Sequence, residues 1–187
     1  MKTTSNQIFK EAINLLKTLK GKTLNSITHE PFTPETFAYG LVYMAIDGVN
    51  YALTDYQVPV DYFGGIEDLS LIKFELHDGP KKSNLKGVKF VTDKIGRKIS
   101  GITLVNSEQI IKDKETGDEH TFLDTQCIIF TFDGKDQMSF TKDDFCEMIS
   151  IYTGNDAKND IEDFLNDYLN GFTPDVEGKS RIIYIDL

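Results

Sequence analysis

GRKISGIT (Gly96–Thr103) opens a stretch that repeats an earlier one, GKTLNSIT (Gly21–Thr28). Both segments read glycine, a basic residue, any residue, an aliphatic residue, any residue, a small residue, isoleucine and threonine. Further along, LVYMAIDG (Leu41–Gly48) is echoed by CIIFTFDG (Cys127–Gly134). After each Asp-Gly comes a short segment in which apolar and polar residues alternate, and further along comes a pair of neighbouring acidic residues. This order predicts a degenerate duplication of a unit of four antiparallel strands.

Two amphipathic helices are expected to flank these units. Near residues 5–20, apolar residues recur at helical spacing, and Thr4 or Ser5 can cap the first turn. Near residues 156–170, a second apolar stripe ends before Gly171 and Pro174. The sequence therefore favours an α+β fold, in which two related antiparallel β units form a curved sheet or barrel-like body between an N-terminal and a C-terminal helix.

The chain divides into residues 1–76, with the first helix and the first β unit, and residues 85–187, with the second unit, an acidic helix and a terminal strand. The polar, turn-rich segment 77–84 is the linker between them. We expect the two parts to pack as one globular body, and strand 181–185 is apolar enough to lie inside a sheet. Contact between the units should bury Ile27, Val42, Met44, Ile102, Ile128, Phe130 and Ile149.

Charge is distributed unevenly along the 187 residues, whose net charge is −10. Residues 104–187 contain 19 acidic and 7 basic residues, whereas residues 1–103 contain 11 and 13. The negative charge of the second half disfavours direct binding of nucleic acid or an anionic membrane and attracts basic proteins or cations. The alternative is that the acidic surface simply keeps the protein soluble. No run of 18 apolar residues occurs, and we expect a soluble protein in the cytoplasm of a bacterial host cell.

The expected C-terminal helix carries a row of carboxylates. Its aspartates are spaced by four, three and four residues, which places them on one helix face, away from the apolar stripe. Like charges at this spacing are mutually destabilising, and the row could imitate a nucleic-acid backbone. The alternative is a solvated polar face. The carboxylate row consists of Asp156, Asp160, Asp163 and Asp167.

Two other groups of residues could contact a partner. Asp143, Asp144 and Glu147 form an acidic group at the entry to a strand, where adjacent carboxylates point to opposite faces. The insertion 55–65 supplies the aromatic residues Tyr56, Tyr62 and Phe63, which could anchor a partner or cover a small sheet.

Signals for catalysis are missing from the sequence. Cys127 and Cys146 lack a glycine-rich nucleophile turn and metal-ligand spacing, and the three histidines are scattered. No phosphate-binding, dinucleotide-binding or metalloprotease motif occurs. We therefore predict no catalytic residues, no metal site, no cofactor and no enzymatic activity, and we expect both thiols to be reduced and packed.

The segment FDG (Phe132–Gly134), followed by DDFCEMISI (Asp143–Ile151) and DIEDFL (Asp160–Leu165), resembles an uncharacterised small β-rich domain of bacterial and phage proteins. In that domain an Asp-Gly hairpin precedes Asp-Cys-Cys-Glu and an acidic segment. Phe145 stands here in place of one cysteine. The resemblance covers about a third of the chain and implies no assigned activity.

These observations lead to two functional hypotheses. The first is a non-enzymatic inhibitor whose acidic second half occupies the basic nucleic-acid-binding surface of a target protein, as an anti-defence (anti-CRISPR) protein of a phage or an immunity protein would. The second is a protein that binds a nucleotide or phosphorylated metabolite in a pocket between the two units or under the aromatic insertion. The cations available for such a ligand are Lys22, Arg97, Lys98 and Arg181.

Overall fold

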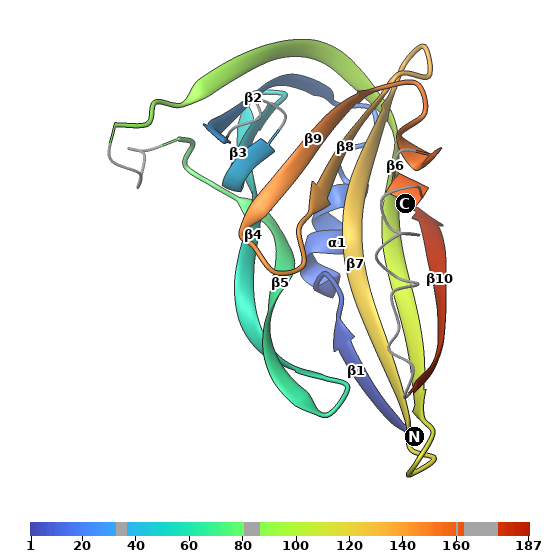
Figure 1. Cartoon of the computed structure of the whole chain (residues 1–187). Helices are drawn as coiled ribbons and strands as arrows, with labels where there is room; N and C mark the ends of the chain where they lie inside the picture. Colours follow the sequence, from blue (N-terminus) through green and yellow to red (C-terminus); the bar gives the residue numbers. More distant parts are fainter. Residues whose placement is uncertain (33–36, 81–86, 160, 163–175) are drawn as a thin grey trace.

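The fold is built almost entirely of strands (Figure 1). The computed structural model describes residues 1–32, 37–80, 87–159, 161–162 and 176–187. One helix within these residues is α1 (Lys10–Lys17), and residues 157–159 and 161–162 are also helical. The strands are β1 (Lys2–Asn6), β2 (Thr23–Phe32), β3 (Phe37–Ile46), β4 (Val49–Tyr62), β5 (Gly65–Leu76), β6 (Val91–Asp113), β7 (Glu119–Phe132), β8 (Gln137–Lys142), β9 (Met148–Gly154) and β10 (Val176–Asp186).

Strand pairing closes a ring. β2 pairs with β6, β6 with β7, β7 with β8, β8 with β9, β9 with β3, and β3 with β2, all antiparallel. The long strand β6 closes this ring, because its first part pairs with β2 and the rest pairs with β7. Two further strands extend the ring at its sides: β1 lies parallel to β7, and β10 lies antiparallel to β6.

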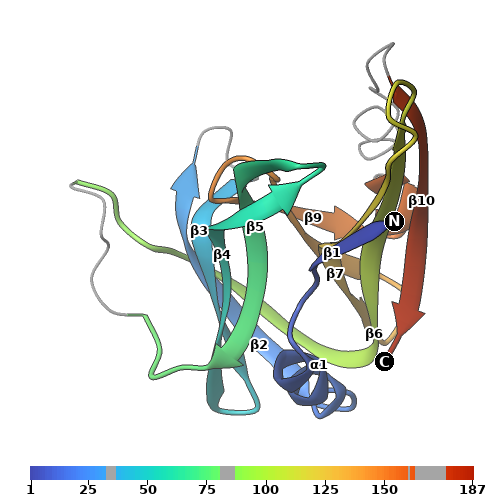
Figure 2. The same ribbon diagram turned by 90° about the horizontal axis from the view of Figure 1, so that it is seen from below.

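The hairpin of β4 and β5 leaves the ring at Gly40. Residues Phe37–Tyr39 of β3 pair with β9, whereas Leu41–Ile46 pair with β4 instead. Gly40 between them has a φ of +56°, and a Cβ there would lie 3.3 Å from the carbonyl oxygen of Asp55. The change of partner therefore depends on a residue without a side chain. Seen from below, β4 and β5 stand apart from the layer formed by β1, β7, β6 and β10 (Figure 2).

Each predicted β unit corresponds to four consecutive strands paired in sequence order. β2, β3, β4 and β5 form one antiparallel series, and β6, β7, β8 and β9 form the other. Asp47-Gly48 forms a tight turn, since both residues have positive φ angles and β3 pairs directly with β4 across them. A second hairpin turns around residues 112–119, between β6 and β7.

One hydrophobic core fills the ring. All of the residues predicted to be buried between the units are buried in a single cluster, which confirms that prediction: Ile27, Val42, Met44, Ile102, Ile128, Phe130 and Ile149. α1 contributes Ala12 and Leu16 to the same cluster, so its apolar face covers one part of the ring interior. A smaller cluster joins Ala157 and Ile161 to the outer side of β6, β7 and β10.

The predicted α+β class with flanking helices is wrong, because the chain folds mainly as strands. The first helix was expected from about residue 5, but Lys2–Asn6 pair with His120–Asp124 of β7 and so form β1. This long-range pairing overrides the local capping signal at Thr4 and Ser5. Much of the expected second helix lies outside the described residues.

The terminal strand also differs from its prediction. β10 pairs only with β6 among the described strands and therefore lies at a sheet edge rather than inside. Its apolar residues Ile182 and Tyr184 pack against Ala157 and Ile161, which accounts for their hydrophobic character. None of the helical segments that the structure describes has the length and apolar character needed to cross a membrane.

Candidate functional site

A cleft of about 440 Å³ lies between β1 and β4. Tyr56, Val58 and Val60 of β4, with Leu71 of β5 and Phe9, make its apolar side. Its polar side comes from β1 and the residue that follows it, with Asp61 at the end of β4. We name this opening the β1–β4 cleft, and its remaining lining residues are Thr4, Ser5, Asn6, Gln7 and Pro59.

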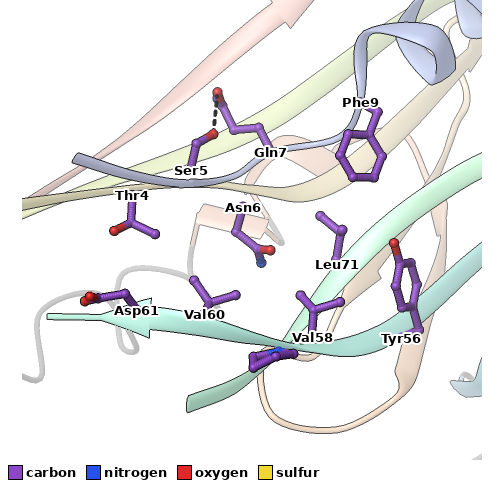
Figure 3. Close-up of a pocket in the computed structure, with 11 residues that line it drawn as sticks. Thr4, Ser5, Asn6, Gln7, Phe9, Tyr56, Val58, Val60, Asp61 and Leu71 are labelled. Carbon is purple, nitrogen blue, oxygen red and sulfur yellow. Dashed lines mark hydrogen bonds between the residues drawn. The ribbon is translucent and has the colours of Figure 1, made fainter. Parts of the chain in front are cut away.

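Two strand faces look at each other across the cleft (Figure 3). The side chains of Thr4 and Asn6 extend from β1 toward those of Val58 and Val60, which extend from β4. This follows from the alternation of side chains along a strand, which puts residues two apart on one face. Ser5 and Gln7 point to the other side of β1, where the Ser5 hydroxyl donates to Gln7.

A set of contacts fastens the tip of the β4–β5 hairpin to β1, β6 and β7. Tyr62 lies edge-on to Phe122 with 5.1 Å between ring centroids, and its hydroxyl donates to Gln109 over 3.2 Å. Phe63 packs on both of these rings. Lys2 forms an ion pair with Asp61. These contacts, which we call the hairpin clasp, close one end of the cleft.

Asn6 connects the cleft to a buried group of charged residues. Its side chain is only 4% exposed, and its amide nitrogen donates to the Ser70 carbonyl at 2.8 Å and to Asp124 at 3.2 Å. Because both neighbours are acceptors, the orientation of the Asn6 amide is fixed with its nitrogen toward them. Its oxygen has no donor among the described residues.

The buried group is centred on Lys142, whose side chain is 0% exposed. The Lys142 ammonium lies 2.7 Å from Asp124 and 2.8 Å from Asp144, and it donates to the Ser70 carbonyl at 2.6 Å. Asp55 is also buried nearby, and we call these residues, with Asn6, the Lys142 cluster. The Ser70 amide in turn donates to the Asp144 carbonyl, so the cluster joins the edge of β5 to the second unit.

Burial perturbs the ionisation of this cluster. It raises the pKa of Asp55 to about 8, although Lys142 and the nearby Ser70 hydroxyl oppose this rise. Neither oxygen of Asp55 has a well-formed hydrogen bond among the described residues. Burial likewise raises the pKa of Asp124 to about 8 against the attraction of Lys142. For Lys142, burial favours a lower pKa, but the two carboxylates outweigh it and raise the pKa.

The Lys142 cluster was not predicted from the sequence, although the alternation of buried and exposed residues along its strands indicates it. Lys142 continues the buried face of Met138 and Phe140, and Asp55 continues that of Tyr51 and Leu53. A charged residue in register with a buried face indicates a buried polar contact. The sequence does not show which strands would bring these residues together.

The predicted carboxylate row lies mostly outside the described residues. Asp156 is exposed just before the helical residues 157–159, and it accepts a hydrogen bond from Asn159. Asp160, Asp163 and Asp167 fall in the segments that the structure leaves undescribed. The hypothesis that this row occupies a basic partner therefore stays a prediction.

The acidic group of Asp143, Asp144 and Glu147 is partly occupied within the protein itself. Asp143 accepts the backbone N–H groups of Phe145 and Cys146 and so shapes the turn before β9. Asp144 is paired with Lys142. Glu147 remains half-exposed. Asp144 is therefore paired with a cation inside the protein, and Asp143 has a structural role in a turn at the strand entry.

The aromatic residues of the insertion divide between two roles. Tyr56 is half-exposed and lines the β1–β4 cleft. Tyr62 and Phe63 belong to the hairpin clasp, where they cover Phe122. The sequence left open whether the aromatic residues anchor a partner or cover a small sheet, and Tyr62 and Phe63 cover a sheet.

The four candidate cations do not form one site. Lys22, Arg97 and Lys98 lie near the start of β2 and its partner segment of β6. The Arg97 guanidinium forms an ion pair with Asp136 and lies over the ring of Phe132. Arg181 pairs instead with Glu108, eleven residues further along β6 than Arg97 and roughly 35 Å away along the strand.

Cysteine and histidine residues form no evident reactive centre in the described part of the chain. Cys127 is buried and Cys146 is exposed, so the expectation of packed thiols holds for the first and is wrong for the second. His29 is buried beside Asp93, with 3.5 Å between the paired atoms. Within the described residues, no group of three or more His, Cys, Asp or Glu side chains could hold a metal ion.

Comparison of the chain with protein-family models, with curated proteins and with solved structures gives no match. The resemblance of the second half to a small bacterial and phage domain therefore stays a prediction.

Proposed function

We propose that this protein is a non-enzymatic binding protein that takes up a small amphipathic molecule in the β1–β4 cleft. The observation that carries the proposal is the pairing of an apolar wall, Tyr56, Val58 and Val60, with a polar wall, Thr4 and Asn6, across about 440 Å³. This size and mixture of surfaces are usual for sites that bind small organic molecules.

Exposed apolar surface around the cleft supports the same proposal. Phe9 is 52% exposed although it is a large hydrophobic residue, and Val58 and Val60 are half-exposed. Water contact with such surface is unfavourable, and a bound ligand would remove it at roughly 25 cal/mol for each Å² of apolar area. The cleft is thus better suited to an apolar ligand body than to water.

The lining disfavours the phosphorylated ligand that the sequence suggested. Asp61 is the charged side chain among the lining residues, and its charge is engaged by Lys2. Recognition of a phosphate needs converging cations or backbone amides. The candidate cations Arg97 and Arg181 belong to other parts of the fold. We therefore propose a ligand without a phosphate group.

A fragment screen tests this function. Neutral and singly charged compounds of about 10–20 heavy atoms, a size suited to such a cleft, would be screened by ligand-observed NMR against the wild type and against Val58→Trp. The larger Trp side chain would occupy part of the cleft and obstruct a ligand. Ile66→Trp is the matched control, because Ile66 lies on the same hairpin, is 71% exposed and does not line the cleft.

We expect hits that bind the wild type and Ile66→Trp but lose binding to Val58→Trp. Circular dichroism would show that both variants keep the strand-rich fold. If no compound distinguishes Val58→Trp from Ile66→Trp, the cleft is not a ligand site and the proposed function is wrong.

A further inference from the structure

We propose that the β1–β4 cleft selects an amphipathic amine, meaning a compound with a protonated amino group on an apolar body. This inference rests on the proposed function and adds the chemical class of the ligand. It is carried by the hydrogen-bonding capacity left on the polar wall of the cleft.

Asn6 presents an acceptor to the cleft. Both neighbours of its amide nitrogen, the Ser70 carbonyl and the Asp124 carboxylate, accept hydrogen bonds. An amide nitrogen can make two such bonds, so its donor capacity is used. What remains is the amide oxygen, on a side chain that is 96% buried and lines the cleft. A ligand that reaches this atom must donate a hydrogen bond.

The carboxylate at one end of the cleft favours a cationic donor over a neutral one. Asp61 lies at the clasp end, and hydrogen bonds from Lys2 and from the Gly64 amide lower its pKa, which keeps it ionised. The Asp61 carboxylate would attract a positive ligand, which would share it with Lys2 in a partly exposed ion pair, and it would repel a ligand carboxylate or phosphate.

The apolar wall of the cleft fits the apolar body of an amphipathic amine. Tyr56 offers an aromatic ring, and Val58, Val60 and Leu71 offer aliphatic contacts on the opposite wall. An ammonium group at Asn6 would therefore leave an aryl or alkyl body against these residues. Tyr56 can also attract a cation over its ring face.

Three compounds that share the same apolar body test amine selection separately from ligand binding as such. They are 4-phenylbutylamine, 4-phenylbutanol and 4-phenylbutyrate. Their dissociation constants would be measured by NMR titration at pH 7 with the wild type, Val58→Trp and Ile66→Trp. Hydrogen bonds to charged groups contribute more than neutral ones. We therefore expect the amine to bind roughly tenfold tighter than the alcohol, the carboxylate to bind weakest, and Val58→Trp to abolish the binding that Ile66→Trp retains.

Other outcomes would overturn the inference. If the alcohol or the carboxylate binds as tightly as the amine, and Val58→Trp still abolishes binding, the cleft binds ligands but does not select an amine. If none of the three compounds binds the wild type, the amine class is also wrong, and the fragment screen decides the proposed function separately. Binding that is equal in Val58→Trp and Ile66→Trp contradicts both proposals, because the compounds would then bind elsewhere.

Discussion

The buried ammonium group of Lys142 lies 2.7 Å from a carboxylate oxygen of Asp124 on the neighbouring strand. Asp124 also accepts hydrogen bonds from Asn6 and from Gln126. This arrangement fixes Asn6, a wall residue of the β1–β4 cleft, to the second β unit. The Lys142 cluster therefore connects the integrity of the fold to the shape of the cleft.

Removal of the Lys142 charge should destabilise the protein strongly. Lys142→Met would leave the buried Asp124 and Asp144 without their cation and the Ser70 carbonyl without one of its donors. Breaking a buried pair in this way costs about 3–5 kcal/mol. The free energy of unfolding would be measured by urea denaturation.

Lys73→Met is the control for this experiment, because Lys73 pairs with Glu75 while its side chain is 44% exposed. Exposed pairs of this kind contribute about 0–1 kcal/mol. If the two variants lose the same stability, the Lys142 cluster does not hold the fold together.

Stability should fall as the pH rises from about 5 to 8. The pKa of Asp55 is raised to about 8, whereas in the unfolded chain it lies near 4. Between these values the folded state keeps a proton that the unfolded state has released, so raising the pH favours unfolding.

Asp55→Asn isolates the contribution of one carboxyl group, because the amide resembles a protonated carboxyl in shape and carries no titrating proton. Urea denaturation at pH 5, 6.5 and 8 should show a smaller loss of stability in the variant than in the wild type. Parallel curves for the two proteins would mean that Asp55 is not the group that stays protonated.

Gly40→Ala should destabilise the junction where β3 changes partner. Gly40 has a φ of +56°, and an added Cβ would approach the carbonyl oxygens of Asp55 and Glu147 to 3.3 and 3.4 Å. Strain of this kind costs about 1–3 kcal/mol. At Gly101, where φ is not positive and the nearest atom of another residue is 3.7 Å from an added Cβ, the same substitution should change the melting temperature far less. Equal losses at both positions would contradict the explanation.

Local patterns predicted the core, since they placed residues such as Ile27 and Phe130 on buried faces. They failed at β1, whose residues carry helix-capping signals but pair with β7, more than a hundred residues away. The cleft could not be predicted for the same reason. Its walls, with Asn6 on one strand and Val58 on another, face each other only because of long-range pairing.

The hairpin clasp should control how often the β1–β4 cleft opens at one end. Tyr62→Ala would remove the edge-on contact with Phe122 and the hydrogen bond to Gln109, while the β4–β5 ladder stays intact. We expect faster amide hydrogen exchange at residues 61–65 and a loss of about 1–2 kcal/mol in the free energy of unfolding, as for a partly buried aromatic contact. Ile66→Ala is the control, because Ile66 neighbours the clasp but is 71% exposed. Exchange that accelerates equally in both variants would show that the tip is not held by Tyr62, and a ligand would then enter the cleft without crossing this barrier.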